Sequence, residues 1–209
     1  MQVAELHVPG AWSFTPRQLR DPRGVFLEWF QAATLEQALH HPLVVKQANH
    51  SVSSRGALRG VHYADVPPGQ AKYVYCTRGA VLDVVVDIRS GSPTFGVSDA
   101  VRLDDVDRRA VYLSAGLGHA FLALTEQADV SYLCSEPYDP VREHGLSALD
   151  PALDLPWPTD LEPLLSAKDA AAPTLAEAQA AGLLPSYDAC ARFYDTLRNG
   201  DSLRRGSGQ

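Results

Sequence analysis

Residues 72–96 read KYVYCTRGAVLDVVVDIRSGSPTFG, a segment with two apolar runs, KYVYC and AVLDVVVDI. A Thr-Arg-Gly sequence separates the two runs, and Ser-Gly-Ser-Pro follows closely after the second. Valine and tyrosine favour β-strands, and glycine and proline interrupt them. The segment therefore predicts two short strands with a turn between them.

The same pattern continues on both sides of this segment, from residue 25 to about residue 135. Val, Tyr and Phe dominate the further runs, and Gly or Pro interrupts them every 8–15 residues. Such spacing is typical of an all-β sandwich or barrel. Before residue 160 only TLEQALHH (34–41) predicts a helix, which excludes alternating strands and helices.

The composition changes after Trp157-Pro158. Residues 166–187, SAKDAAAPTLAEAQAAGLLPSY, favour helix, with Ser166 as a possible N-cap and Gly182 near a helix end. Pro173 interrupts this segment, so we expect two short helices. We expect the last dozen residues, 198–209, to form a frayed tail. The predicted organisation is a β-domain over 1–163 with a helical extension over 164–209.

Charge and composition narrow the class of ligand. The chain has 209 residues, a net charge of −7, 45% hydrophobic and 21% charged residues, as expected for a folded globular protein. An acidic balance argues against general nucleic-acid binding, which needs a basic surface. Residues 17–78 nevertheless hold eight Lys or Arg against four Asp or Glu. A small anionic ligand would fit this basic segment.

Cysteine usage and hydropathy predict a location. The three cysteines, Cys76, Cys134 and Cys190, form no CxxC pair, which is typical of buried or incidental thiols in a reducing compartment. The N-terminal residues lack the pattern of a secretory signal, and no apolar run is long enough for a transmembrane helix. We therefore expect a cytoplasmic protein that does not bind membranes.

Three cationic candidates flank the turn Pro67-Pro68-Gly69-Gln70. Arg59 and His62 precede the turn, and Lys72 follows it. Strands joined by a short connection tend to pair, so these side chains are expected to share one face of a sheet. They would repel one another without an anion or neighbouring acids. A lone strand histidine is more often a core residue, so both interpretations stay open.

A second group of polar residues lies on other predicted strands. Alternation places Tyr132 on an inward face, either as a core aromatic bonded to backbone or as a proton donor. Gln47, Asn49 and Ser51 alternate along one strand face, which indicates either solvent or a polar cavity. His119 follows a glycine turn at a strand start.

Common catalytic motifs are missing from the sequence. A metal-binding double-stranded β-helix needs two histidines two residues apart, but Gly60 and Ala64 stand at these positions around His62. The sequence contains neither a GxSxG motif nor a glycine-rich phosphate loop. The sequence therefore does not favour a metal centre, a serine hydrolase or a nucleotide-binding P-loop.

Several longer motifs together resemble one family. They are DPRGVF (21–26), QANHS (47–51), RGVHY (59–63), PGQAK (68–72), DVVVDIRSGSPTFG (83–96), GHAF (118–121) and SAKD (166–169). In order and spacing these motifs resemble the dTDP-4-dehydrorhamnose 3,5-epimerase family. The similarity covers roughly residues 15–170, and the helical tail looks like the branch that makes deoxysugars for antibiotics.

The resemblance implies a cupin-type jelly roll that acts without metal or organic cofactor. It also implies a homodimer in which an N-terminal strand crosses to the partner. The implied substrate is a dTDP-4-keto-6-deoxyhexose, epimerised at C3, at C5 or at both. Ala64 and Leu117 depart from the usual residues of bifunctional members and are expected to loosen the pocket, which leaves the reacting centre open. A 3,4-ketoisomerase and a non-catalytic sugar-nucleotide binder remain alternatives.

The resemblance also implies residue roles. His62 matches the family's base, Tyr132 its proton donor and Lys72 the residue at the C4 carbonyl, while Asp169 would orient His62. A base and an acid on opposite faces, with a cation at the enolate oxygen, are what such an inversion requires. The implied substrate-binding residues are Arg23, Phe26, Glu28, Gln47, Asn49, Ser51, Arg59, His119, Tyr138, Glu143 and Lys168.

Overall fold

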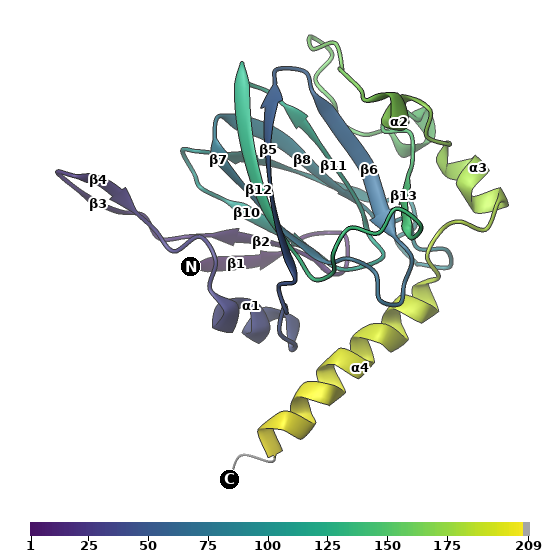
Figure 1. Ribbon diagram of the computed structural model, residues 1–209, viewed down its shortest axis with the longest axis horizontal. Helices are drawn as coiled ribbons and strands as arrows, with labels where there is room; N and C mark the ends of the chain where they lie inside the picture. Colours follow the sequence, from purple (N-terminus) through teal and green to yellow (C-terminus); the bar gives the residue numbers. More distant parts are fainter. Residues whose placement is uncertain (207–209) are drawn as a thin grey trace.

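Two antiparallel sheets and a separate hairpin make up the strands of the protein (Figure 1). The computed structural model describes the backbone of residues 1–206 and the side chains of residues 1–200. The six-stranded sheet has the order β1 (Gln2–Glu5), β2 (Ala11–Thr15), β10 (Ala110–Leu113), β7 (Lys72–Arg78), β12 (Gln127–Cys134) and β5 (Gln47–Ser54). The five-stranded sheet has the order β13 (Glu143–Gly145), β6 (Leu58–Ala64), β11 (Gly118–Ala123), β8 (Ala80–Val86) and β9 (Ser98–Asp104).

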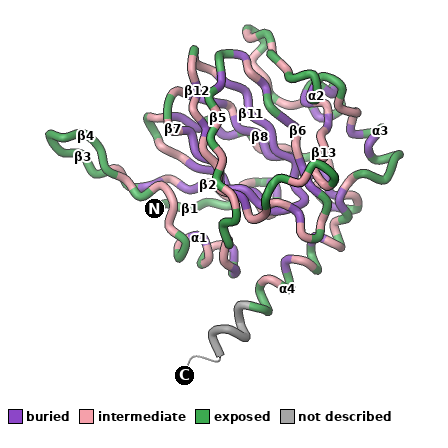
Figure 2. The backbone as a smooth tube through the Cα atoms, viewed as in Figure 1, coloured by how far each residue is buried: buried purple, intermediate pink, exposed green. Residues whose placement is uncertain are grey.

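The main hydrophobic core lies between the two sheets. Val74 of β7 and Val85 of β8 belong to one buried cluster, each at most 1% exposed, although their strands lie in different sheets. Full burial of such a side chain stabilises the fold by about 1.5–3 kcal/mol. Figure 2 shows this buried interior in purple. The arrangement confirms the predicted all-β, cupin-type jelly-roll sandwich.

The outer faces of both sheets are also covered. Helix α1 (Ala32–Leu39) packs its buried residues Leu35 and Leu39 against outward-facing tyrosines of the six-stranded sheet. The 3₁₀ helix η1 (Pro151–Leu153) and helix α3 (Leu175–Ala180) contribute to the cluster on the other outer face. Helix α2 (Ala167–Ala170) precedes α3 and is capped by Ser166. The expected pair of short helices is confirmed.

The expected frayed tail is wrong for the residues that the structure describes. Helix α4 runs from Tyr187 to Gly206, and it extends away from the sandwich (Figure 1). Cys190 and Tyr194 lie one turn apart and are buried, so tertiary packing supports the beginning of this helix. Residues 207–209 of the expected tail lie outside the described residues. Within residues 1–206, no helix has both the length and the apolar composition that a membrane crossing requires.

A small hairpin projects from the sandwich at the left of Figure 1. It consists of β3 (Leu19–Asp21) and β4 (Gly24–Phe26), and it pairs with neither large sheet (Figure 1). All residues of both strands are exposed (Figure 2). Phe26 is 65% exposed, which is unusual for a large aromatic side chain.

Strands β6 and β7 do not pair, which corrects the expectation that Arg59, His62 and Lys72 share one sheet face. The two strands belong to different sheets. Their connection contains Pro67-Pro68, and proline has no backbone N–H to continue a ladder. The chain therefore crosses from one sheet to the other. Arg59 and His62 therefore lie on one wall of the sandwich and Lys72 on the other.

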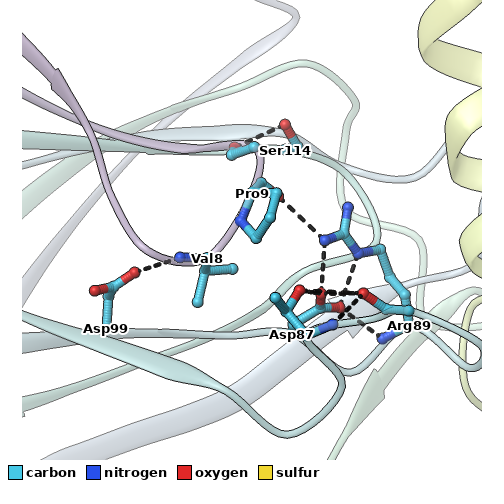
Figure 3. Close-up of polar contacts among 9 residues, drawn as sticks. Val8, Pro9, Asp87, Arg89, Asp99 and Ser114 are labelled. Carbon is cyan, nitrogen blue, oxygen red and sulfur yellow. Dashed lines mark hydrogen bonds and ion pairs between the residues drawn. The ribbon is translucent and has the colours of Figure 1, made fainter.

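A buried ion pair joins distant parts of the chain (Figure 3). The Nε and Nη2 atoms of Arg89 donate to the two carboxylate oxygens of Asp87 at 2.8 and 2.7 Å. Nη2 also donates to the backbone carbonyl of Pro9 at 3.1 Å. The Cζ atom of Arg89 lies 5.2 Å from the centre of the Tyr187 ring, at the start of α4. Arg89 therefore connects the N-terminal arm, the segment after β8 and α4.

Replacing Arg89 with Met is expected to lower the free energy of unfolding by about 3–5 kcal/mol, because Asp87 would remain buried without its counter-charge. Urea denaturation followed by circular dichroism measures this loss. Arg109→Met is the matched control, since Arg109 pairs with Asp107 at the surface and should cost under about 1 kcal/mol. Equal losses in both variants would contradict the anchoring role of Arg89.

Candidate active site

A bulge in β6 directs two functional side chains to one side. Arg59 and His62 are three residues apart, so a regular strand would point them to opposite faces. The register of β6 against β11 shifts between these residues, and Gly60 has a φ of +117°. A Cβ atom at Gly60 would lie 2.4 Å from the carbonyl oxygen of His119, so only glycine fits. The bulge allows Arg59 and His62 to line the same pocket.

This pocket is a cavity of about 490 Å³ between the two sheets. The six-stranded sheet contributes Gln47, Asn49, Ser51, Lys72 and Tyr132. The five-stranded sheet contributes Leu58, Arg59, His62, His119, Phe121 and Glu143. Ala57, Gln70, Tyr138, Leu164, Leu165, Ser166, Lys168 and Asp169 complete the lining. Of the two interpretations left open for the polar face of β5, the polar cavity is correct.

His62 is held by a carboxylate from α2. Its Nε2 atom lies 2.7 Å from Oδ1 of Asp169, and the Ser166 hydroxyl donates to Oδ2 at 2.9 Å. Burial alone would raise the pKa of Asp169, but the hydrogen bonds from His62 and Ser166 outweigh it and lower the pKa. An ionised Asp169 accepts from Nε2–H and thus leaves Nδ1 as the unprotonated nitrogen of the neutral ring.

Tyr132 occupies the opposite wall from His62. Its strand, β12, belongs to the six-stranded sheet, whereas β6 belongs to the five-stranded sheet. Burial raises the pKa of Tyr132, and the nearby Cys134 adds to this shift, while a hydrogen bond from Asn49 opposes it. The phenol therefore keeps its proton at neutral pH. This placement and protonation state suit a proton donor to the pocket.

Lys72 places an ammonium group in the same wall as Tyr132. The side chain is only 8% exposed, and burial lowers its pKa against the influence of Cys134, Glu143 and Asp83. Burial raises the pKa of the Cys134 thiol to about 11, so this neighbour is neutral at pH 7. Its pocket position suits Lys72 to stabilise negative charge that develops on a ligand oxygen.

A second His–Asp pair lies across the strands from the first. His119 is the register partner of His62 in β11. Its Nε2 atom lies 2.8 Å from Oδ2 of Asp83, and both side chains are buried. Tyr138 and Lys168 face each other at the rim, with the Lys168 Nζ atom 6.0 Å from the centre of the Tyr138 ring.

Three of the expected substrate-binding residues lie apart from this pocket within one chain. Arg23 is exposed in the β3–β4 hairpin and pairs with Asp21. Phe26 is exposed on β4, and Glu28 accepts a hydrogen bond from Gln31. None of the three belongs to the pocket lining. Their substrate contacts remain predictions.

Other differences from the sequence-based expectations concern neighbouring positions. Gln70 and Ser166 line the pocket without having been assigned a site role, although both stand in the motifs PGQAK and SAKD. Their positions near Lys72 and Asp169 in the sequence could have indicated that they belong to the site. Leu117 lies in the core between the sheets at 2% exposure, and neither it nor Ala64 is part of the pocket lining. The looser pocket expected from these two residues therefore stays a prediction.

Comparisons with known proteins agree with this geometry. The sequence profile of the family described as dTDP-4-dehydrorhamnose 3,5-epimerase matches residues 5–177. A protein of that name from Mycolicibacterium smegmatis is 57% identical over 198 residues, which cover 95% of this chain and 98% of the relative.

Two solved structures are also similar. The rmlC epimerase of Mycobacterium tuberculosis has a TM-score of 0.93 and 52% identity, covering 95% of this chain and 100% of that one. ChmJ, a 3′-monoepimerase from Streptomyces bikiniensis in complex with dTDP-quinovose, has a TM-score of 0.90 and 53% identity, covering 92% of this chain and 98% of that one. The chain therefore belongs to the dTDP-4-dehydrorhamnose 3,5-epimerase family, whose members are isomerases.

Proposed function

We propose that this protein epimerises a dTDP-4-keto-6-deoxyhexose at C3, at C5 or at both centres, without a cofactor. The observation that carries the proposal is the position of His62 and Tyr132 on opposite walls of one pocket that also contains Lys72. An inversion beside a ketone requires a base on one face of the sugar ring and an acid on the other.

Each proposed step has a group suited to it. The Nδ1 atom of His62 removes the proton from the carbon next to the C4 ketone, and the electron pair moves onto the ketone oxygen. The Lys72 ammonium stabilises the resulting enolate, while Asp169 stabilises the imidazolium. Tyr132 then donates its proton to the opposite face of that carbon, and the ketone re-forms. Proton exchange with solvent restores neutral His62 and the Tyr132 phenol.

Polar residues around these groups are proposed to bind the rest of the substrate. The guanidinium of Arg59 and the ammonium of Lys168 supply positive charge for the diphosphate, which arginine matches with paired N–H groups. The remaining proposed contacts from the lining are Gln47, Asn49, Ser51, His119, Tyr138 and Glu143.

The names of two relatives indicate which centre reacts. The M. smegmatis relative is named a 3,5-epimerase, whereas ChmJ is a 3′-monoepimerase, so C3 is common to both names. We therefore expect inversion at C3 and treat C5 as the result to be measured.

Deuterium exchange tests the function and the two main roles. In D₂O the wild-type protein should catalyse incorporation of deuterium into the dTDP-4-keto-6-deoxyhexose at C3, at C5 or at both. NMR of the sugar measures the exchange at each centre. His62→Ala should abolish exchange at every centre, because the base is lost. Tyr132→Phe should spare proton removal and impair inversion. Equal activity in both variants would refute the role assignment.

The same NMR experiment separates the alternative functions. A 3-keto product without inversion would indicate a 3,4-ketoisomerase. Binding of dTDP without any change in the sugar would indicate a non-catalytic binder. Either result with correctly folded wild-type protein would overturn the proposed epimerisation.

Asp169→Asn is expected to lower kcat by a factor of about 10²–10⁴, since an amide no longer holds the required tautomer of His62. The dissociation constant for dTDP should stay unchanged, as measured by calorimetry. The control is Asp154→Asn at an exposed position outside the pocket. A normal kcat for Asp169→Asn would show that His62 does not depend on this carboxylate.

We further propose a homodimer in which the N-terminal strands are exchanged. The β3–β4 hairpin projects from its own chain and carries Arg23 and the exposed Phe26, with Glu28 just beyond it (Figure 1). A pocket completed by a partner's hairpin would use all three residues. The free edges and the exposed aromatic ring of this hairpin also favour association.

Mixing two inactive variants tests this exchange. Arg23→Ala and His62→Ala should each have low activity, but refolding them together should recover about a quarter of wild-type activity. Half of the dimers would then be mixed, and one of their two pockets would contain both intact residues. No recovery in dimers shown to be mixed would contradict the exchange.

A cytoplasmic location is also proposed. Cys76, Cys134 and Cys190 are free thiols, and all three are buried. Such thiols persist in a reducing compartment. Separating the cell's compartments and detecting the protein with an antibody would test the location.

A further inference from the structure

The Lys72 ammonium lines the pocket together with Glu143, but it pairs with no carboxylate of the described residues. Glu143 and Asp83 both act electrostatically on Lys72. Among the residues whose side chains are described, however, Lys72 forms no hydrogen bond and no ion pair within 4.0 Å. A buried ammonium normally gains a partner, because an unpaired buried charge is costly. Other contacts must therefore explain why neither Glu143 nor Asp83 pairs with Lys72.

Gln70 holds the first carboxylate. Its Nε2 atom donates to Oε1 of Glu143 at 3.2 Å and to the backbone carbonyl of Glu136 at 3.0 Å. The amide NH₂ group has two N–H donors, and both are used. The Glu143 side chain is therefore linked to the segment that follows β12. Glu143 is the first residue of β13, and it pairs there with Ala64 of β6.

His119 holds the second carboxylate by an equivalent contact. Its Nε2 atom lies 2.8 Å from Oδ2 of Asp83. The Oδ1 atom of Asp83 is buried and has no hydrogen-bond partner among the described residues. Without His119, the Asp83 carboxylate would therefore be buried without a partner, and a nearby cation would be its favourable partner. Both nearby carboxylates are restrained by side chains other than Lys72.

We propose that Gln70 is a positioning residue that holds Glu143 away from Lys72 and thereby keeps the ammonium free for the enolate oxygen. The inference rests on the role of Lys72 in the proposed function. A preorganised cation stabilises a transition state well because it need not be released from another partner first. An ion pair between Glu143 and Lys72 would have to break in every turnover.

Gln70→Met tests the proposal, since methionine is similar in length but cannot hold a carboxylate. We expect kcat for deuterium exchange to fall about tenfold, which is less than the 10²–10³ expected for loss of a direct donor. The dissociation constant for dTDP and the thermal midpoint should stay at wild-type values. Gln179→Met, at an exposed position of α3, is the matched control. Gln70→Leu provides a second variant with the same expected loss.

A double-mutant cycle identifies the group through which Gln70 acts. In a Glu143→Gln background no carboxylate remains to pair with Lys72, so Gln70→Met should lower kcat by less than about twofold. A tenfold loss in both backgrounds would overturn the proposal, because Gln70 would then act independently of Glu143. Unchanged kcat in Gln70→Met alone would also overturn it.

Lys72→Met distinguishes this inference from the proposed function. If wild-type protein exchanges deuterium and Lys72→Met does so equally fast, the role of Lys72 fails and the inference fails with it. If Lys72→Met is slow but Gln70→Met and Gln70→Leu are normal, the proposed function stands and only the inference fails.

Discussion

Asp87 and Arg89 form a buried ion pair on which three separate parts of the chain depend. Arg89 also donates to the backbone carbonyl of Pro9 in the N-terminal arm (Figure 3). Its guanidinium lies over the ring of Tyr187 in α4. An ion pair of this kind is costly to break, because either partner alone would be a buried, uncompensated charge. The arm that begins at this anchor continues into β2 and then into the exposed β3–β4 hairpin. The proposed sharing of the hairpin between two chains thus starts from a firmly held point in each chain.

The division of the site between two sheets is a direct result of the jelly-roll topology. The connection between β6 and β7 crosses the sandwich, so His62 and Lys72 face each other although only ten positions separate them. Tyr132 lies on β12, which pairs with β7, and its register partner Val74 is two residues from Lys72. Outside the pocket, the hydrophobic core between the two sheets holds these two walls together. Because the proposed base and the proposed acid belong to different sheets, they would meet opposite faces of a sugar ring bound between them.

Local patterns in the sequence predicted much of this molecule. Valine-rich runs separated by turns predicted the strands, and alternation correctly placed Tyr132 on an inward face. Membership of β6 and β7 in different sheets is a long-range property, and a short connection suggested the wrong pairing. Helix α4 was missed because its support comes from the buried Cys190 and Tyr194 rather than from composition. Gln70 was overlooked as a site residue because its importance depends on Glu143, which is 73 positions away in the chain.

The contact between His62 and Asp169 spans 107 positions of the chain. Its carboxylate comes from a four-residue helix, whereas its imidazole belongs to a strand inside a sheet. Short peripheral segments open locally at a lower free energy than core strands, while the rest of a protein stays folded. Opening of α2 would release the imidazole from its carboxylate and leave the sandwich intact. In the proposed mechanism, activity would therefore depend on a local equilibrium of this segment, and it should decline in mild denaturant before the β-sheet signal of the sandwich changes.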